Sequence, residues 1–170
     1  MLGWRLRRLG GVLASWCLLL AVGGSAAEAR VVFKRADGSE VRFAGTPRAW
    51  CGPWESDVAR PSVHVALGSV KHRWHLSAVR RDLAIGRRIK FPNDFVWNRP
   101  RGALLFVADG ANEASSAEEE SSGSIEFSRV TCRRGGVLAF SIQGVLGSEY
   151  FDGEPVRVSG TYRGRVSQRP

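Results

Sequence analysis

Residues 156–166, VRVSGTYRGRV, decide the fold class, because apolar and polar side chains alternate through the whole stretch. One side of the alternation carries Val156, Val158, Gly160, Tyr162 and Val166, and the other carries Arg157, Ser159, Thr161, Arg163 and Arg165. A period of two residues is that of a β-strand with one face buried. The stretch therefore predicts a strand with an apolar inner face and an arginine-bearing outer face.

Shorter stretches of the same kind fill the chain before it, and turn-forming residues separate them. They are residues 31–35, 40–44, 62–67, 72–79, 87–91, 125–132 and 137–146. Asp37-Gly38 between the first two predicts a hairpin. Residues 103–108, ALLFVA, are apolar on both sides, which favours a central strand that is covered on both faces.

About eight or nine short strands at this spacing predict an all-β protein, a single-domain antiparallel β-sandwich or barrel-like fold. No long segment keeps helical periodicity with caps, and strands do not alternate with helix-length segments, so an α/β architecture is excluded. The domain is expected to cover residues 30–170. Residues 45–61, rich in proline and tryptophan, are interpreted as an irregular connection.

Residues 1–29 have the layout of a secretory signal peptide. Three arginines precede an apolar run over residues 9–22, and small residues follow it. Cleavage is predicted near Ala29 or Ala27. The apolar run is about 14 residues long, whereas a membrane-spanning helix needs roughly 20. We therefore expect a secreted or periplasmic protein with no transmembrane segment after cleavage.

Removal of this leader takes Cys17 with it and leaves two cysteines, Cys51 and Cys132. In an oxidising compartment, a pair of cysteines is expected to form one disulfide. The alternative is a nucleophilic Cys51, but no family-type sequence surrounds it.

Residues 109–123, DGANEASSAEEESSG, predict an exposed, acidic and mobile loop, because their composition offers little to a core. Carboxylate and amide oxygens such as those of Asp109, Asn112 and Glu113 could serve a calcium site. Their spacing does not follow the EF-hand pattern. A calcium-dependent module is thus one alternative function, and no other cofactor is expected.

The sequence lacks the motifs of the common hydrolases, nucleotide-binding enzymes and zinc enzymes: G-x-S-x-G, G-x-x-x-x-G-K-[ST], G-x-G-x-x-G, H-E-x-x-H and C-x-x-C. The three histidines, His64, His72 and His75, are too few to complete a metal site by themselves and are interpreted as strand residues. No catalytic residue is assigned. A secreted enzyme of unfamiliar type, pairing a histidine with a carboxylate, is kept as an alternative.

The formal net charge is +9, and Lys34, Lys71 and Lys90 are the lysines among its 25 basic residues. An arginine-rich surface attracts polyanions, although a GC-rich genome also favours arginine without selection for binding. Arg157, Arg163 and Arg165 share one face of the last predicted strand and are the predicted anion-binding residues.

These features predict an exported non-enzymatic binding module. Its expected partner is an anionic envelope polymer, a lipid head group or another exported protein, while nucleic acid is disfavoured by the export signal. Trp50 and Trp54 offer a second surface, either as a stacking platform or as a cover for one end of the fold beside the disulfide.

Overall fold

The computed structural model describes residues 28–52, 62–80, 83–93, 102–149 and 153–167, which form 11 strands and no α-helix. In chain order the strands are β1 (Glu28–Lys34), β2 (Glu40–Val41), β3 (Arg48–Gly52), β4 (Ser62–Gly68), β5 (His72–Val79), β6 (Arg88–Phe91), β7 (Ala103–Asp109), β8 (Asn112–Ser115), β9 (Ser122–Val130), β10 (Val137–Ser148) and β11 (Val156–Ser167). The predicted all-β class is confirmed. The strands number two or three more than the sequence predicted.

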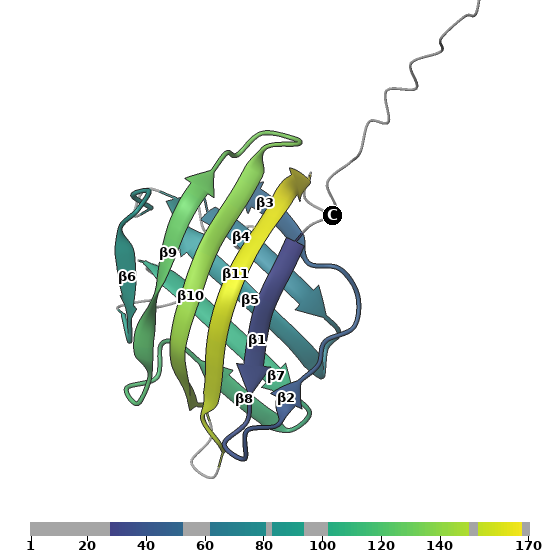
Figure 1. The fold of residues 1–170 in the computed structure, drawn as a ribbon, viewed down its shortest axis with the longest axis vertical. Coiled ribbons are helices and arrows are strands. Elements are labelled where there is room, and N and C mark those ends of the chain that lie inside the picture. The colour runs from purple at the N-terminus through teal and green to yellow at the C-terminus, as the bar shows by residue number, and fades with distance from the viewer. Residues whose placement is uncertain (1–27, 53–61, 81–82, 94–101, 150–152, 168–170) are drawn as a thin grey trace, which may run out of the picture.

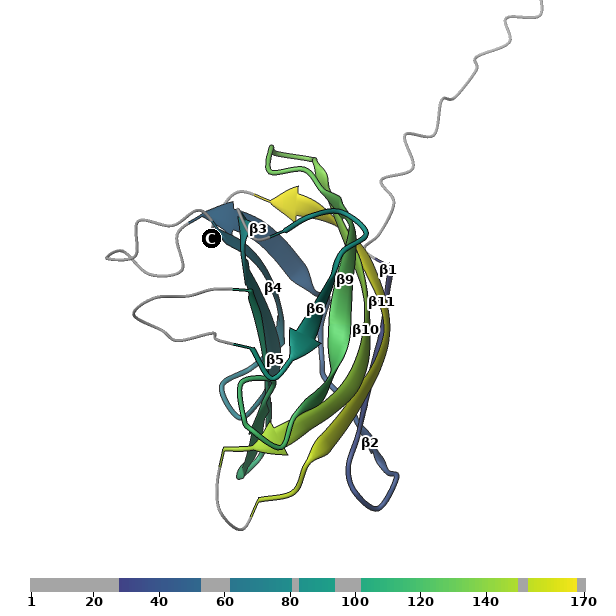
Figure 2. The same cartoon turned by 90° about the vertical axis from the view of Figure 1, so that its left-hand side faces the viewer.

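The strands lie in two layers, which Figure 2 shows edge-on. Sheet A has the order β2-β1-β11-β10-β9-β6, and sheet B has the order β3-β4-β5-β7-β8. The end of β11 pairs in parallel with β3, and the end of β10 pairs with β8, so the two sheets are hydrogen-bonded to each other at both sides. In Figure 1 sheet A faces the viewer and the strands of sheet B cross behind it.

The predicted alternation of buried and exposed residues is observed along β11. Val156, Val158, Tyr162 and Val166 are buried, while the arginines, serines and threonine between them are exposed. β11 lies between β1 and β10 in the middle of sheet A, where its inner face meets sheet B. A central strand with one solvated face requires this pattern, because its other face supplies the core.

Large aromatic side chains fill the core: Phe33 of sheet A contacts Trp74 of sheet B, and three further rings of sheet A pack on one another. Phe33 lies 5.9 Å from Trp74, and Phe140 lies 5.6 Å from Phe127 and 5.2 Å from Tyr162, as measured between ring centroids. All five rings are buried. Burial of one such side chain stabilises a fold by roughly 2–3 kcal/mol, so this core holds the two sheets face to face.

The predicted hairpin joins β1 to β2. Phe33 pairs with Val41, and the turn closes through hydrogen bonds from the Arg35 amide to the Ser39 carbonyl and from the Gly38 amide to the Arg35 carbonyl. Gly38 has a φ of +85°, which only glycine adopts at low cost. The hairpin predicted from Asp37-Gly38 is therefore confirmed.

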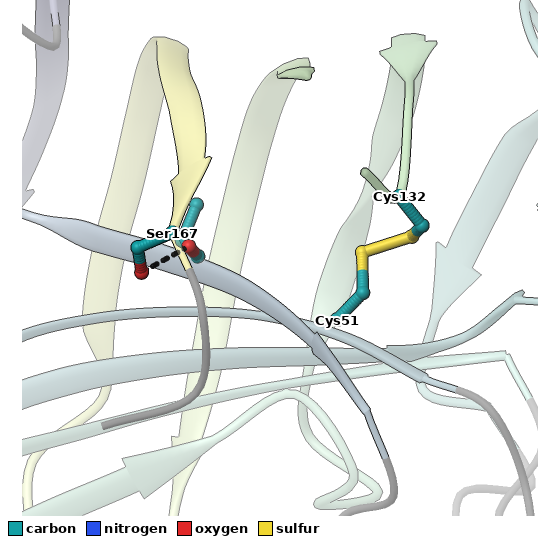
Figure 3. Close-up of a disulfide and its surroundings, with 4 residues drawn as sticks. Cys51, Cys132 and Ser167 are labelled. Atoms are coloured by element: carbon teal, nitrogen blue, oxygen red, sulfur yellow. Dashed lines mark hydrogen bonds between the residues drawn. A yellow bond between two sulfur atoms is a disulfide. The ribbon is translucent and has the colours of Figure 1, made fainter. Parts of the chain in front are cut away.

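The predicted disulfide between Cys51 and Cys132 is present, with a Cα–Cα distance of 5.6 Å (Figure 3). It links β3 of sheet B to the segment that follows β9 of sheet A. Near it, the Ser167 hydroxyl donates a hydrogen bond of 3.0 Å to the Ala49 carbonyl. Together these contacts fasten the parallel junction between β11 and β3.

The prediction of an irregular connection over residues 45–61 is wrong for Arg48–Gly52, which form β3. This strand pairs with β4 along its whole length and with the end of β11. One of its partners, β11, is distant in the chain, and the local sequence is rich in turn-forming residues, so it carries little sign of a strand. Residues 53–61, including Trp54, lie outside the described residues.

The prediction of an exposed loop over residues 109–123 is also wrong in part. β8 occupies Asn112–Ser115, and Ala114, Ser115 and Ser121 are buried. The Ser121 hydroxyl donates to the Ser115 carbonyl (2.7 Å) and accepts from the Gly147 amide (2.8 Å). These serines satisfy backbone groups where sheet B meets β10, a role that composition does not reveal. Glu119 and Glu120 are exposed as predicted.

The predicted leader lies almost wholly outside the described residues. Its last two residues, Glu28 and Ala29, form the start of β1 and pair with Arg163 and Tyr162 of β11. Within the described part of the chain, no helix has the length and apolar character needed to cross a membrane.

Candidate functional site

The outer face of sheet A carries the predicted anion-binding arginines. Arg157, Arg163 and Arg165 are all exposed on the same side of β11. Residues along a strand rise about 3.3 Å each, so Arg163 and Arg165 are about 7 Å apart, whereas Arg157 is about 20 Å away. The three predicted arginines therefore form one close pair, Arg163 and Arg165, with Arg157 far from both.

A β-bulge adds another arginine to the pair. The register between β9 and β10 shifts between Ala139 and Phe140, so that Ser128 is the extra residue and Arg129 opposes Ala139. Ala139 also opposes Arg163 on its other side. Arg129 and Arg163 are therefore about two strand spacings, or about 10 Å, apart across a small side chain. We call Arg129, Arg163 and Arg165 the arginine cluster.

The acidic groups close to these arginines have other partners. Glu28 opposes Arg163 on β1, and its carboxylate lies 3.0 Å from the Arg30 guanidinium. Arg157 at the other end opposes Lys34. Positive charge is therefore adjacent to positive charge at Arg157 and Lys34, while the acidic neighbour of Arg163 is shared with Arg30.

A shallow groove of about 340 Å³ lies on the same face, between the two ends. Its walls are mostly hydroxyl and amide side chains: Ser124, Ser141, Gln143, Ser159 and Thr161. On β11, Ser159 and Thr161 stand between Arg157 and Arg163. Glu126 in the groove is held by Arg88, with an Nε–Oε2 distance of 3.2 Å. The groove thus offers neutral hydrogen-bonding groups along its length.

The outer face of sheet B is different, because much of it is buried. Its polar centre is a cluster of four side chains, Trp50, His64, His75 and Ser77, which we call the histidine cluster. Ser77 Oγ lies 2.8 Å from His64 Nδ1 and 3.2 Å from His75 Nε2. The Trp50 ring stacks on both imidazoles, at centroid distances of 5.0 and 5.7 Å.

Burial dominates the electrostatics of this cluster. Burial, with smaller contributions from the neighbouring His64 and Arg73, lowers the pKa of His75 to about 4. His75 is therefore neutral near pH 7. Ser77 touches two histidines, as a nucleophile would, but Ser77 is 2% exposed and His64 is 1% exposed. A substrate has no access to that hydroxyl, so the arrangement is structural.

Beside the histidine cluster lies a larger hollow of about 740 Å³, which we call the sheet B hollow. Trp50 and Arg48 of β3 form one side of it, and Arg73, His75 and Phe106 of β5 and β7 form the other. Residues 44–46 and Glu149 complete the lining. The volume is within the range of about 300–1,000 Å³ that ligand pockets occupy.

The residues considered for calcium, Asp109, Asn112 and Glu113, make contacts within the fold. Asp109 receives both Arg35 Nε and Nη2 at 2.6 Å and lies 3.3 Å from His72 Nδ1, which ties the end of β1 to β5 and β7. The Asn112 amide exchanges two 3.0 Å hydrogen bonds with the backbone of Glu154. Glu113 pairs with Ala108 in the ladder between β7 and β8.

Asp109 and Asn112 were two of the residues considered for a calcium site. In this arrangement both are engaged with other protein groups. Over the ranges that the structure describes, no three histidine, cysteine or acidic side chains gather as a metal site would require. His72 is next to a carboxylate, but that carboxylate is held by an arginine.

Sequence reasoning did not single out Arg48, Arg73, Phe106 and Arg129. Arg73 is exposed on the outer face of β5. Its neighbours across the sheet follow from register, and register is set by long-range pairing that one sequence does not show. Trp50 was proposed as a platform or a cover, and it is a half-buried wall of the hollow.

No family model matches this chain, and neither the curated proteins nor the solved structures include a match to it.

Proposed function

We propose that the protein is an exported, non-enzymatic binding module that holds an anionic polymer across the outer face of sheet A. The observation that carries the proposal is the arrangement on that face. Exposed arginines stand at both ends of a groove lined by hydroxyl and amide groups.

The spacing of the charges favours a chain over a single small anion. Arg157 and Arg163 are separated by about 20 Å of strand. A small anion could reach one end, whereas a polymer with repeated carboxylate or sulfate groups could contact both. Ser159 and Thr161 would then donate hydrogen bonds to the uncharged part of the polymer between the two ends. Arginine suits such groups because its guanidinium binds them with two parallel hydrogen bonds.

Two features support export. The disulfide between Cys51 and Cys132 is of the kind that persists in oxidising compartments. The small residues Ser25-Ala26-Ala27 offer a cleavage site directly before Glu28, where β1 begins. Cleavage there keeps the pairs that Glu28 and Ala29 form with Arg163 and Tyr162 of β11, whereas cleavage after Ala29 removes both. We therefore favour Ala27 as the last residue of the leader.

The test is retention of the oxidised protein on a heparin matrix as the salt concentration rises. The variant Arg157→Ser/Arg163→Ser/Arg165→Ser is compared with Arg42→Ser/Lys71→Ser/Arg80→Ser. Both variants lose three exposed cations, but the second set lies away from the groove. Loss of three ionic contacts lowers the slope of log affinity against log salt by about two units, by analogy with nucleic-acid binding. We expect this change only in the first variant.

Equal elution of the two variants would overturn the proposal, because retention would then follow net charge alone. Separate measurement of Arg157→Ser and of Arg163→Ser/Arg165→Ser distinguishes a polymer from a small anion. A polymer that spans the groove is weakened by either change, whereas loss confined to the double variant would show that only the arginine cluster binds.

A further inference from the structure

The sheet B hollow exists because β4 places small residues between two strands with large ones. Ala66 pairs with Arg48 on β3 and with His75 on β5, and Gly68 pairs with Arg73. Gly68 has a φ of +104°, and a Cβ there would collide with the carbonyl oxygen of His72. The backbone itself therefore excludes a side chain from this part of the floor.

Aromatic rings stand on both sides of that floor. Trp50 is stacked on His64 and His75, which leaves its ring little freedom to move. Phe106, opposite His75 on β7, lies beneath the guanidinium of Arg73, at 5.3 Å from Arg73 Cζ to the ring centroid. Rings that are held in place before a ligand arrives lower the entropic cost of binding.

Two arginines flank the floor of the hollow, Arg48 on the β3 side and Arg73 on the β5 side. Arg48 and Arg73 line it and are exposed, so each has guanidinium donors within reach of a ligand. Glu149 lines the side nearer β8, where its amide donates to the Glu113 carbonyl. An anionic group is therefore attracted to the space between the two arginines and repelled from the side near Glu149.

We propose that the sheet B hollow binds a small aromatic carboxylate. Its ring would lie over Ala66 between Trp50 and Phe106, and its carboxylate would accept hydrogen bonds from Arg48 and Arg73. Flat apolar walls with a few convergent donors are the usual character of a small-molecule site. The neutral His75 beside the ring adds a polar contact without a third positive charge. The site is on the opposite layer from the groove of sheet A and goes beyond the polymer-binding function.

The probes are 2-naphthoate and 2-naphthamide, which have the same ring and differ in charge. Binding of each to the oxidised full chain is measured by isothermal titration calorimetry at low salt. A charge-assisted hydrogen bond that is lost changes affinity by about tenfold or more, so we expect naphthoate to bind at least tenfold more tightly than naphthamide. Equal affinities, or no saturable binding of either probe, would overturn the proposal.

Three variants locate the site. Arg48→Gln and Arg73→Gln are each expected to reduce the preference for naphthoate over naphthamide, because each removes a cation from the rim. Lys71→Gln is the matched control, since it removes an exposed cation from the neighbouring β4–β5 turn that does not line the hollow. Ala66→Leu fills the floor and is expected to weaken both probes by about tenfold or more.

Two further measurements keep the outcome unambiguous. Thermal unfolding of each variant shows that it is folded, and Arg48→Gln, at an exposed position, provides a second test should Ala66→Leu fail to fold. The Arg157→Ser/Arg163→Ser/Arg165→Ser variant is expected to bind naphthoate like the wild type. Loss of naphthoate binding in that variant, with Arg48→Gln unchanged, would place the anion on sheet A and refute the site on sheet B.

Discussion

The outer faces of the two sheets differ in a way that their sequences hardly suggest. Both β11 of sheet A and β5 of sheet B alternate polar and apolar residues. The outward residues of β11 are exposed, from Arg157 to Ser167. In sheet B the outward residues Ser77, His64 and Leu104 are buried, at 2%, 1% and 4% exposure. Alternation identifies the side that faces the core, but it does not say whether the other side faces water.

The two faces use polar groups for different purposes as a result. On sheet A the guanidinium groups keep their hydration, and their charge is available to a ligand. On sheet B the polar groups are a serine and imidazoles that can be neutral and hydrogen-bonded to each other. Burial of a charged group without a partner is costly, so only residues of the second kind suit the buried part of that face, whereas Arg48 and Arg73 are exposed.

The largest effect is expected from removal of the disulfide that joins the two layers. Cys51 and Cys132 are 81 residues apart, and closure of a loop of that length stabilises the folded chain by about 4 kcal/mol on chain-entropy reasoning. Cys51→Ala/Cys132→Ala should lower the free energy of unfolding by that order in urea titrations. The wild type under reducing conditions is the control and should show the same loss. An unchanged midpoint in both would show that the two layers do not depend on the bridge.

The comparison between the faces is tested directly by one substitution on each. Leu104→Ala on sheet B removes buried apolar atoms and should cost about 3 kcal/mol in the free energy of unfolding. Thr161→Ala on sheet A changes an exposed strand residue and should cost under about 1 kcal/mol. Chemical denaturation measures both. Similar losses for the two would mean that the outer faces are equally buried in solution, contrary to the structure.

The histidine cluster predicts that the stability of the fold depends on pH between about 4 and 6.5. The pKa of His75 is about 4 in the folded chain, mainly because of burial, and about 6.5 when unfolded. Between these values the unfolded chain binds more protons. The stabilisation is therefore complete above about pH 6.5 and is lost as the pH falls toward 4, by on the order of 3 kcal/mol.

Denaturant midpoints measured from pH 7 to pH 4 give this slope, and His75→Gln should flatten it. Arg163→Ser on the exposed face is the control and should leave the slope as it is in the wild type. A His75→Gln variant with the same slope as the wild type would assign the effect to other groups.

The smallest effects concern the two ion pairs. Arg35→Gln leaves Asp109, whose side chain is 7% exposed, without its two short hydrogen bonds, and should cost about 1–2 kcal/mol. Arg88→Gln removes a pair on sheet A whose side chains are 74% and 36% exposed, and should cost under about 0.5 kcal/mol. Thermal melts in low and high salt compare them. A larger loss for Arg88→Gln would reverse the expected order.

Much of the fold could be predicted from local pattern. β4, β5, β7, β10 and β11 lie where alternation or continuous apolar character placed them, and β7 is covered on both faces as its run ALLFVA predicts. β3 and β8 were missed, because a Trp–Cys–Gly stretch and an acidic serine-rich stretch have little strand propensity of their own. β3 and β8 form strands because neighbouring strands supply their pairing partners.

The candidate sites were predictable only in part for the same reason. Arg157, Arg163 and Arg165 could be placed on one exposed face, since their spacing along one strand sets that face. That Arg129 joins two of them follows from a bulge in β9, which a single sequence does not show. The sheet B hollow depends on the pairing of Ala66 with both Arg48 and His75, residues from three different strands.

The sequence by itself determined the strand class, the inner face of the main strands, the hairpin at Gly38 and the pairing of Cys51 with Cys132. Each of these depends on local geometry or on a choice with few alternatives. Only the tertiary structure decided which outward side chains are buried, because burial depends on what packs over a face. It also decided which arginines gather and where a hollow opens, because cross-strand register, set by long-range pairing, brings distant residues together.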